Sequence, residues 1–457
     1  MISSLHKKYD TVITNGNVID VINGTVEKKN VGISGDKITA VTSDDLTGAS
    51  YFDAGGLAVS PGFIDFHSHV DGNVFSGECL VKQGGTTTLG GERELSSKSI
   101  DRVENGFIVN QGFSISQSFV LRNAVGVTDP KRPARPREID AMVDLARRFM
   151  EYGAFAICFG LELVPGTSFD ELLALSAVAK EYNRPILVHL RKDGREALRY
   201  FDEIIKVAGL TGVKVQILQL MYMVGIGGAM PEALRIIEEA RNDGLDITAD
   251  SGLYDAYCAC IGTGIFEKGW EKEYGNVSAE DLLISSGIHA GENCSRKLFS
   301  ELRRDYPQTL VTAFVCDSDA IPMALEKDYV YVSTNAADGP HYPGIGAPEV
   351  SGTFPRLLGR YVREKKLLSL VEAIRKITVL PAERFGLKDI GEIKEGMNAD
   401  IVVFDQERII DNANFIGLGR PDADPDGIAA VYVNGKLVVD NGCLTKNRKA
   451  GKFIKRE

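Results

Sequence analysis

Two histidines one residue apart follow an apolar stretch in the segment 63–69, FIDFHSH. Side chains at positions i and i+2 of a strand project from the same face, so both imidazoles are able to bind one metal ion. The chain has only six histidines, and two of them share this motif directly after Ser-Pro-Gly at 60–62. We therefore predict that His67 and His69 bind a metal ion; the alternative is a pair of polar histidines at a strand end.

Two further residues stand where they would join this pair. His189 ends the apolar segment 185–188, and Asp338 is the nearest carboxylate to the end of the apolar segment 329–333. A lone histidine at a strand end more often makes a structural hydrogen bond, but in a barrel with a His-x-His strand metal binding is favoured. Asp338 is a candidate metal ligand and proton acceptor, and its alternative role is an Asp-Gly turn.

Alternating strands and helices in the middle of the chain must position these residues. Predicted strands at 154–163, 185–189, 213–218 and 245–250 begin about 30 residues apart, the length of a βα unit. Helices are predicted from Pro136 to Gly153 and over 168–182, 195–208 and 231–241. Because no G-x-G-x-x-G turn follows these strands, a closed (β/α)8 barrel is favoured over an open doubly wound sheet. Polar residues at the carboxyl ends of barrel strands form the functional site.

Both ends of the chain are rich in β structure. Strands are predicted over 11–19, 31–34, 37–41 and 57–59, and again over 399–404, 429–433 and 436–439, with Asn434-Gly435 as a hairpin turn. We predict an α/β fold in which residues 61–385 form a metal-dependent (β/α)8 TIM-like barrel. A small β-sandwich domain is formed by both chain termini, residues 1–60 and 386–457.

The amino-acid composition limits the kinds of molecule that the protein is expected to bind. The 457 residues carry 52 Lys and Arg against 63 Asp and Glu, a formal net charge of −11. This acidic balance argues against nucleic acid and anionic membranes, which bind cationic surfaces. Seven cysteines, an odd number, indicate free thiols in a reducing compartment, and no apolar run approaches the roughly 20 residues of a membrane span. We expect a cytoplasmic protein, a homo-oligomer, that acts on a small-molecule substrate.

Several motifs resemble those of the D-aminoacylase (N-acyl-D-amino-acid deacylase) family of the amidohydrolase superfamily. The segment 59–69 is similar to its P-G-F-I-D-x-H-x-H, 153–167 to its G-A-x-G-L-S-x-G-L-x-Y-x-P-G-T, and 189–191 to its H-M-R. Segments 352–361, GTFPRLLGRY, and 399–405, ADIVVFD, match two further blocks, and Val433-Asn434-Gly435 matches the C-terminal sandwich. The resemblance covers most of the chain and implies a metal-dependent amide hydrolase.

The chain departs from the family pattern at the metal site. Arg93 stands in place of a cysteine that holds or bridges zinc, so Glu92 or Glu94 would bridge instead; the alternative is a salt-bridged loop. Gln219 replaces a zinc-binding histidine, and a neutral amide is a poor zinc ligand. No lysine lies on the predicted strand 154–163, which argues against a carbamylated-lysine bridge. We expect one tightly bound divalent metal, zinc or a similar ion, and two only if Glu92 or Glu94 bridges.

The residues expected to bind substrate also depart from the family. Met221 aligns with a family lysine, Gly252 with a tyrosine and Glu349 with an arginine that would bind a carboxylate. An ordinary N-acyl-D-amino acid bound in the family manner is therefore not expected. Arg93 and Lys192 are possible replacement donors, and the candidate substrate-binding residues are Arg191, Gln219, Tyr254 and Glu349.

The main hypothesis is a metal-dependent hydrolase of an amide C–N bond. His67, His69 and His189 hold the ion with Asp338, and the metal lowers the pKa of bound water. Asp338 accepts the water proton and passes it to the leaving nitrogen. The alternatives are a cyclic amide, imide or ureide hydrolase of the hydantoinase or dihydroorotase kind, a heterocycle deaminase, and a non-catalytic binding homologue. Cys258 and Cys260 are expected to be buried thiols near a loop.

Overall fold

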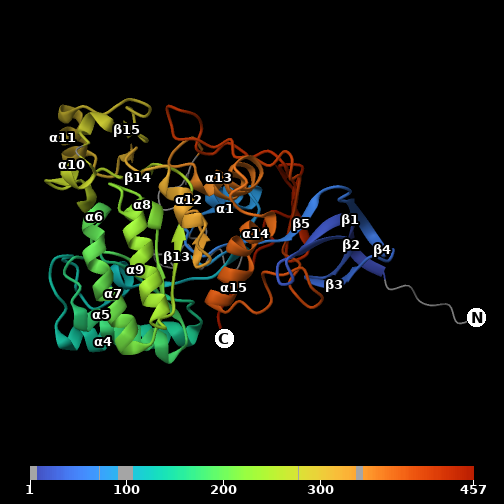
Figure 1. Cartoon of the computed structure of the whole chain (residues 1–457), viewed down its shortest axis with the longest axis horizontal. Coiled ribbons are helices and arrows are strands. Elements are labelled where there is room, and N and C mark those ends of the chain that lie inside the picture. The colour runs from blue at the N-terminus through green and yellow to red at the C-terminus, as the bar shows by residue number, and fades with distance from the viewer. Residues whose placement is uncertain (1–7, 71–72, 91–105, 276, 336–342) are drawn as a thin grey trace, which may run out of the picture.

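The computed structural model describes residues 8–70, 73–90, 106–275, 277–335 and 343–457. It combines α and β structure, as the sequence predicts. In Figure 1 the N-terminal strands (blue) form one end of the molecule, and the helices of the middle of the chain (green) form the other. The C-terminal strands (red) return to the blue ones, so segments far apart in sequence lie side by side.

Both ends of the chain contribute to one nine-stranded sheet. Its hydrogen-bonded order is β21-β20-β19-β18-β5-β1-β2-β3, and β4 pairs with β1. The two ends meet where Ile401 pairs with Pro61 and Phe404 with Ala58, antiparallel. Asn434 (φ 47°) and Gly435 (φ 76°) link β19 and β20, the left-handed pair that a type I′ hairpin turn requires, so this predicted turn is confirmed. The strands are β1 (Lys8–Asp20), β2 (Thr25–Ser34), β3 (Lys37–Thr42), β4 (Thr47–Asp53), β5 (Ala58–Pro61), β18 (Ile401–Phe404), β19 (Ile428–Val433), β20 (Lys436–Asp440) and β21 (Cys443–Leu444).

Two parallel sheets occupy the middle of the chain. One has the order β6-β7-β8 and the other β17-β13-β12-β11-β10-β9. Residues 112–114 connect β8 directly to β9. On the other side a hydrogen bond joins the two sheets, from Asn335 N after β17 to His67 O after β6 (3.0 Å). The strands are β6 (Phe63–Asp65), β7 (Gly85–Thr88), β8 (Asn110–Gln111), β9 (Ile115–Ser116), β10 (Ile157–Gly160), β11 (Pro185–His189), β12 (Lys214–Ile217), β13 (Ile247–Ser251) and β17 (Val330–Val332).

Amphipathic helices follow these strands. In α4, Met142, Ala146 and Met150 are buried at a spacing of four, and Gly153 (φ 112°) ends the helix. The Ser168 hydroxyl accepts a hydrogen bond from Glu171 N and caps α5, at the residue where the predicted helix begins. The helices are α1 (Val74–Lys82), η1 (Gln117–Leu121), α3 (Arg122–Ala124), α4 (Pro136–Tyr152), α5 (Phe169–Glu181), α6 (Gly194–Ala197), η2 (Leu198–Tyr200), α7 (Phe201–Thr211), α8 (Leu220–Val224), α9 (Met230–Asn242), η3 (Gly264–Phe266), α10 (Trp270–Glu273), η4 (Ala279–Asp281), α11 (Arg296–Asp305), α12 (Ala320–Leu325), α13 (Glu349–Arg356), η5 (Leu357–Glu364), α14 (Leu370–Ile377) and α15 (Val379–Phe385).

Two local predictions differ from the structure. The strand expected over 154–163 is shorter, because after Gly160 the amides of Leu163 and Val164 turn back to the Gly160 carbonyl. The sequence also gave no sign of a small antiparallel sheet, β14-β16-β15, formed by β14 (Tyr257–Cys260), β15 (Leu282–Ile284) and β16 (Leu310–Ala313). Cys258 and Cys260 lie on β14, where both are partly exposed, so the expected burial of these thiols is wrong.

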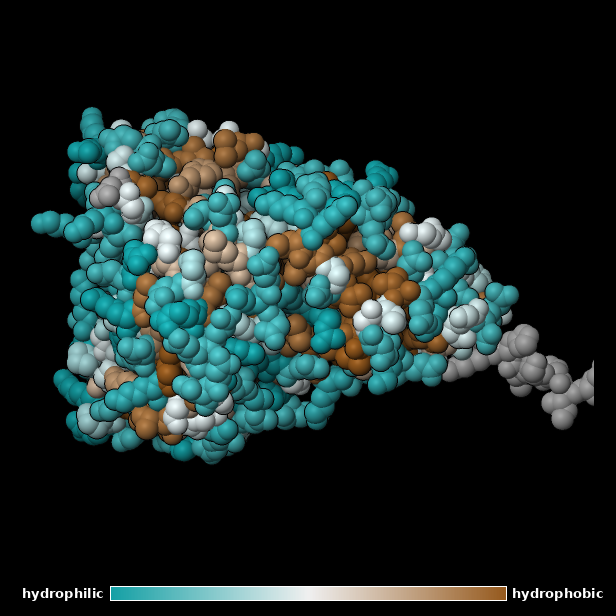
Figure 2. Space-filling model, in the orientation of Figure 1, coloured by the Kyte–Doolittle hydropathy of each residue, from teal (hydrophilic) through white to brown (hydrophobic). Residues whose placement is uncertain are grey.

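Polar side chains cover most of the surface seen in Figure 2, and apolar ones gather around α14 and β5. Within the described ranges, no helix combines the length and the apolar character needed to cross a bilayer. The seven cysteines all lie in the described residues, and none forms a disulfide there.

A buried carboxyl group joins the nine-stranded sheet to the parallel strands. Asp400 accepts hydrogen bonds from Asn434 N (2.7 Å) and from Asn110 Nδ2 (2.9 Å). Burial raises the pKa of Asp400 from 3.8 to about 7, against the effect of these hydrogen bonds. The native state therefore binds more protons than the unfolded state between these two values. The stability that the protonated carboxyl contributes is full below pH 3.8 and is lost as the pH rises through about 7.

We expect Asp400→Asn to flatten the fall in stability between pH 4 and pH 7, because the amide does not titrate. Urea unfolding at several pH values measures this slope for both proteins. Asp389→Asn is the matched control, since the Asp389 carboxylate is largely exposed beside Lys37. Equal slopes in Asp400→Asn and the wild type would contradict the assignment.

Candidate metal centre

A cavity of about 200 Å³ lies at the carboxyl ends of the parallel strands. Two of the predicted metal ligands, His69 and His189, face it together with Gln219. Its walls also include residues of β14, so the unexpected antiparallel sheet closes one side. The lining residues are His69, Phe119, Glu162, Leu163, His189, Asp193, Gln219, Tyr222, Tyr257, Cys258, Ala259, Cys260, Thr263, Ile265 and Asn335.

His67 and His69 follow β6 and are almost fully buried. Their ring centroids are 5.8 Å apart. His67 Nδ1 lies 3.0 Å from Asp250 Oδ2, at the end of β13. With a proton on Nδ1 this contact is a hydrogen bond to the carboxylate, which orients the ring and leaves Nε2 as the ligand atom.

Asp250 is itself held firmly. Its carboxylate accepts hydrogen bonds from Ser333 Oγ (2.6 Å) and from Gln216 Nε2 (3.3 Å), and its side chain is fully buried. Residues from β12, β13 and the end of β17 therefore fix the orientation of the His67 ring. This is the arrangement of a carboxylate behind a metal-binding histidine.

His189 lies between two carboxylates. Its Nδ1 is 3.3 Å from Glu162 Oε1, and its Nε2 is 3.1 Å from Asp193 Oδ1. The Tyr274 hydroxyl donates to the other oxygen of Asp193 at 2.6 Å. The sequence did not single out Glu162 or Asp193. One signal could have identified Glu162. It follows β10, which neighbours β11, the strand that ends at His189, and Gly160 pairs with His189.

Gln219 occupies the place of a family histidine on the cavity wall. Its backbone is in the left-handed region (φ 58°), which residues other than glycine adopt at a cost of about 1–2 kcal/mol. Its side-chain amide donates to Asn335 Oδ1 and lies 3.5 Å from His67 Nε2. The structure thus places Gln219 between the His67 ring and the end of β17, where the sequence predicts a residue that contacts substrate.

Three other predicted substrate-binding residues are engaged elsewhere. Arg191 forms a two-pronged ion pair with Glu203, at 2.7 and 2.9 Å, and does not line the cavity. Tyr254 is buried behind the cavity, where its hydroxyl donates to Asp411 (3.4 Å). Glu349 is buried too and accepts a hydrogen bond from the Tyr222 hydroxyl (3.2 Å), so Tyr222 separates it from the cavity. Roles of Arg191, Tyr254 and Glu349 in substrate binding stay predictions; in the structure each side chain contacts another residue and none lines the cavity.

Asp338 and Glu92 lie outside the described residues, as do Arg93 and Glu94. In the parts of the chain that the structure does describe, no three His, Cys, Asp or Glu side chains form a ready-made metal cluster. The sharing of one ion by His67, His69, His189 and Asp338 therefore stays a prediction. The carboxylates behind His67 and His189 are nevertheless what a metal-binding imidazole requires.

The carboxyl group of Asp65 connects the two strand ends below the cavity. It accepts hydrogen bonds from Thr334 N (3.1 Å) and from the Thr334 hydroxyl (2.5 Å). Burial raises the pKa of Asp65 to about 7. The contact ties β6, which the two histidines follow, to the end of β17.

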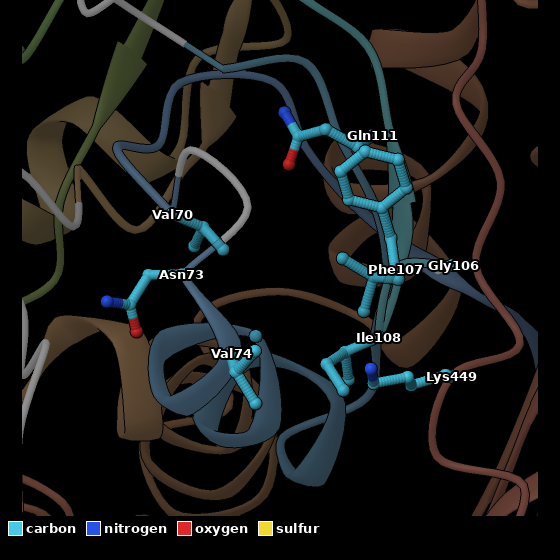
Figure 3. Close-up of a pocket in the computed structure, with 10 residues that line it drawn as sticks. Val70, Asn73, Val74, Gly106, Phe107, Ile108, Gln111 and Lys449 are labelled. Carbon is cyan, nitrogen blue, oxygen red and sulfur yellow. The ribbon is translucent and has the colours of Figure 1, made fainter. Parts of the chain in front are cut away.

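A second cavity is too small to hold a substrate. It lies between the start of α1 and the segment 106–111, as Figure 3 shows, with Val74 on one side and Ile108 on the other. Its volume is about 30 Å³, the space of a single water molecule. The cavity lined by His69 and His189 is the candidate site, because it brings the two predicted metal ligands together.

Comparisons with known proteins identify the family of the chain. The model of the amidohydrolase family matches residues 58–438, most of the chain. The chain belongs to the amidohydrolase family. It is 28% identical to an N-acyl-D-glutamate deacylase of Alcaligenes xylosoxydans xylosoxydans, over 99% of this chain and 98% of the relative. It is 27% identical to a D-aminoacylase of the same organism, over 100% of this chain and 99% of the relative.

A solved structure shares the fold of this amidohydrolase. It is the N-acyl-D-glutamate deacylase of Bordetella bronchiseptica in complex with zinc and a phosphonate inhibitor, with a TM-score of 0.86 and 23% identity. The match covers 98% of this chain and all of the other. The protein is a metal-dependent hydrolase that acts on C–N bonds other than peptide bonds, which confirms the main hypothesis over a non-catalytic binding protein.

Replacement of the carboxylate behind His67 tests the arrangement of this amidohydrolase site. We expect Asp250→Asn to lower metal affinity about 10- to 100-fold, because the amide no longer orients the ring or increases its basicity. Competition with a chelating dye measures this affinity. Asp243→Asn, at an exposed position after α9, is the control and should bind metal as the wild type does. Unchanged affinity in Asp250→Asn would show that Asp250 does not support a metal ligand.

Proposed function

We propose that this amidohydrolase hydrolyses the amide bond of a small N-acylated D-amino acid whose side chain is uncharged. One observation carries the proposal: within the described residues, no lysine or arginine lines the cavity, and its side walls are Phe119, Leu163, Tyr257 and Ile265. An acidic side chain would add a second carboxylate to the α-carboxylate of the amino acid and would need a further charge-assisted donor there. Arg191 does not supply it, since its guanidinium is held by Glu203.

The fold around the site is proposed to be a closed (β/α)8 barrel. If β8 and β9 are counted as one strand interrupted at 112–114, the order is β6-β7-β8/β9-β10-β11-β12-β13-β17, which makes eight strands. The hydrogen bond from Asn335 N to His67 O supports closure between the last strand and the first. The barrel comprises residues 61–385, and residues 1–60 and 386–457 form the β domain.

Metal binding is assigned to His67, His69, His189 and Asp338, with one zinc ion bound tightly. When bound, the metal lowers the pKa of water to about 7 and polarises the substrate carbonyl. Asp338 accepts the proton of the attacking water and donates it to the leaving nitrogen. Gln219, on the cavity wall, holds the substrate by its side-chain amide, and Phe119 and Ile265 exclude water.

A cyclic amide or ureide is the second candidate substrate. The same lack of a basic lining residue favours it, because a ring amide of this kind can be neutral. The volume of about 200 Å³ leaves room for a small ring.

A substrate screen tests the proposal. N-acetyl-D-leucine and N-acetyl-D-methionine are compared with their L enantiomers, with N-acetyl-D-glutamate, and with dihydroorotate and hydantoin. We expect the highest kcat/KM for the apolar D compounds. Preference for N-acetyl-D-glutamate would contradict the assignment of an uncharged side chain, and hydrolysis of only the cyclic compounds would replace the proposal by the second candidate.

A further inference from the structure

Glu162 lines the cavity, and the proposed function gives it no role. It lies two residues beyond β10, on the cavity wall, and its side chain is 14% exposed. The paired strands β10 and β11 place it beside His189, because Gly160 and His189 are partners in the sheet. Its position therefore follows from the fold of the strands and not from a loose surface loop.

The distance between Glu162 and His189 has the value that two ligands of one metal ion require. Zinc binds imidazole nitrogen and carboxylate oxygen at about 2.0–2.2 Å, so two such atoms on a tetrahedral ion are about 3.4 Å apart. Glu162 Oε1 and His189 Nδ1 are 3.3 Å apart. A divalent cation would fit between them with little movement of either side chain.

The other side of the His189 ring is already organised for this role. Nε2 faces Asp193, and Asp193 is held in place by the Tyr274 hydroxyl. A histidine that binds metal through one nitrogen generally donates its other N–H to a carboxylate in this way. Asp193 thus orients the ring, and Nδ1 is directed toward Glu162.

The charge of the cavity also favours a cation. Two carboxylates, Glu162 and Asp193, face it, while no lysine or arginine does so among the described lining residues. Buried carboxylates are generally paired with a cation or bound to a metal. Gln219, where the family has a histidine, contributes no charge and is a poor zinc ligand.

We propose that Glu162 is a metal ligand of this enzyme and binds the ion together with His189 Nδ1. Glu162 then supplies an anionic ligand at a site where Gln219 has replaced a histidine. The inference rests on the proposed metal centre but not on the identity of the substrate.

Metal binding without substrate tests this role. Metal-free wild type, Glu162→Gln and Asp193→Asn are titrated with Zn²⁺ in competition with a chelating dye, and their Co²⁺ forms are compared by visible absorption. We expect Glu162→Gln to lose more than about 100-fold in Zn²⁺ affinity, beyond the range of an orienting carboxylate, and to change the Co²⁺ spectrum. Asp193→Asn should lose about 10- to 100-fold and keep the Co²⁺ bands.

A control variant and a folding measurement distinguish a ligand role of Glu162 from an orienting role. Glu203→Gln changes a carboxylate that pairs with Arg191 outside the cavity and should bind metal as the wild type does. Thermal unfolding confirms that each variant is folded. If Glu162→Gln keeps the Co²⁺ spectrum and loses no more affinity than Asp193→Asn, Glu162 only orients His189 and the inference is wrong. Failure of the wild type to bind any divalent ion would overturn the proposed function as well.

Discussion

His67→Ala should lower kcat/KM by a factor on the order of 10³ or more and reduce the bound metal. Activation of water and of the carbonyl by a metal ion is worth several kcal/mol of transition-state stabilisation, and about 4 kcal/mol corresponds to a factor of about 10³. His67 is nearly fully buried, and its ring is fixed by Asp250 at 3.0 Å. Hydrolysis assays and elemental analysis of the same purified sample measure both effects.

The matched control for this substitution is His289→Ala. His289 is partly exposed and contacts Glu292 on the surface, away from the candidate site. It should keep the activity and the metal content of the wild type. Full hydrolytic activity in His67→Ala would show that the proposed metal centre is wrong.

Arg122→Met should lower the free energy of unfolding by about 3–5 kcal/mol. The Arg122 guanidinium and the Glu171 carboxylate are both fully buried, 2.7 Å apart. Gln117 donates to the other oxygen of Glu171 at 2.7 Å, so the group is a connected network. Removal of the guanidinium leaves a buried carboxylate without its counter-charge. Loss of one partner of a buried ion pair is strongly destabilising for this reason. Urea unfolding at neutral pH measures the loss.

Arg147→Met is the comparison for this loss. Arg147 pairs with Glu181 at 3.2 Å, but the two side chains are 44% and 51% exposed. Exposed ion pairs contribute about 0–1 kcal/mol, so this variant should be close to the wild type in stability. Equal losses in the two variants would contradict the assigned importance of the buried pair.

Four of the parallel strands, β10 to β13, could be predicted because each lies in a short apolar run with clear ends. The segment 185–189 was predicted as a strand and is β11, with His189 at its end. The sheet β14-β16-β15 could not be predicted, because its strands are only three or four residues long and pair across long stretches of chain. Turn residues and periodicity describe neighbours in sequence and carry little information about such pairings.

The residues of the candidate site, too, could be predicted only in part. His69 and His189 were recognised from residue type and strand position, and the structure places both on one cavity. Glu162 was missed, because its approach to His189 depends on the register between β10 and β11. The contact between Arg191 and Glu203 could not be foreseen for a related reason: Glu203, twelve residues away in sequence, is brought next to Arg191 by the fold. Sequence gives the kinds of group at strand ends, whereas the choice of partner depends on the folded geometry.

The pairing of β5 with β18 has a consequence for synthesis of the chain. Residues 58–61 leave the ribosome long before residues 401–404 do, because the two segments are far apart in the sequence. Until then, one edge of β5 has open backbone donors and acceptors beside an apolar face. Nascent or prematurely terminated chains therefore carry an edge that is able to pair with other chains, and a chaperone that covers it would raise the yield of folded enzyme.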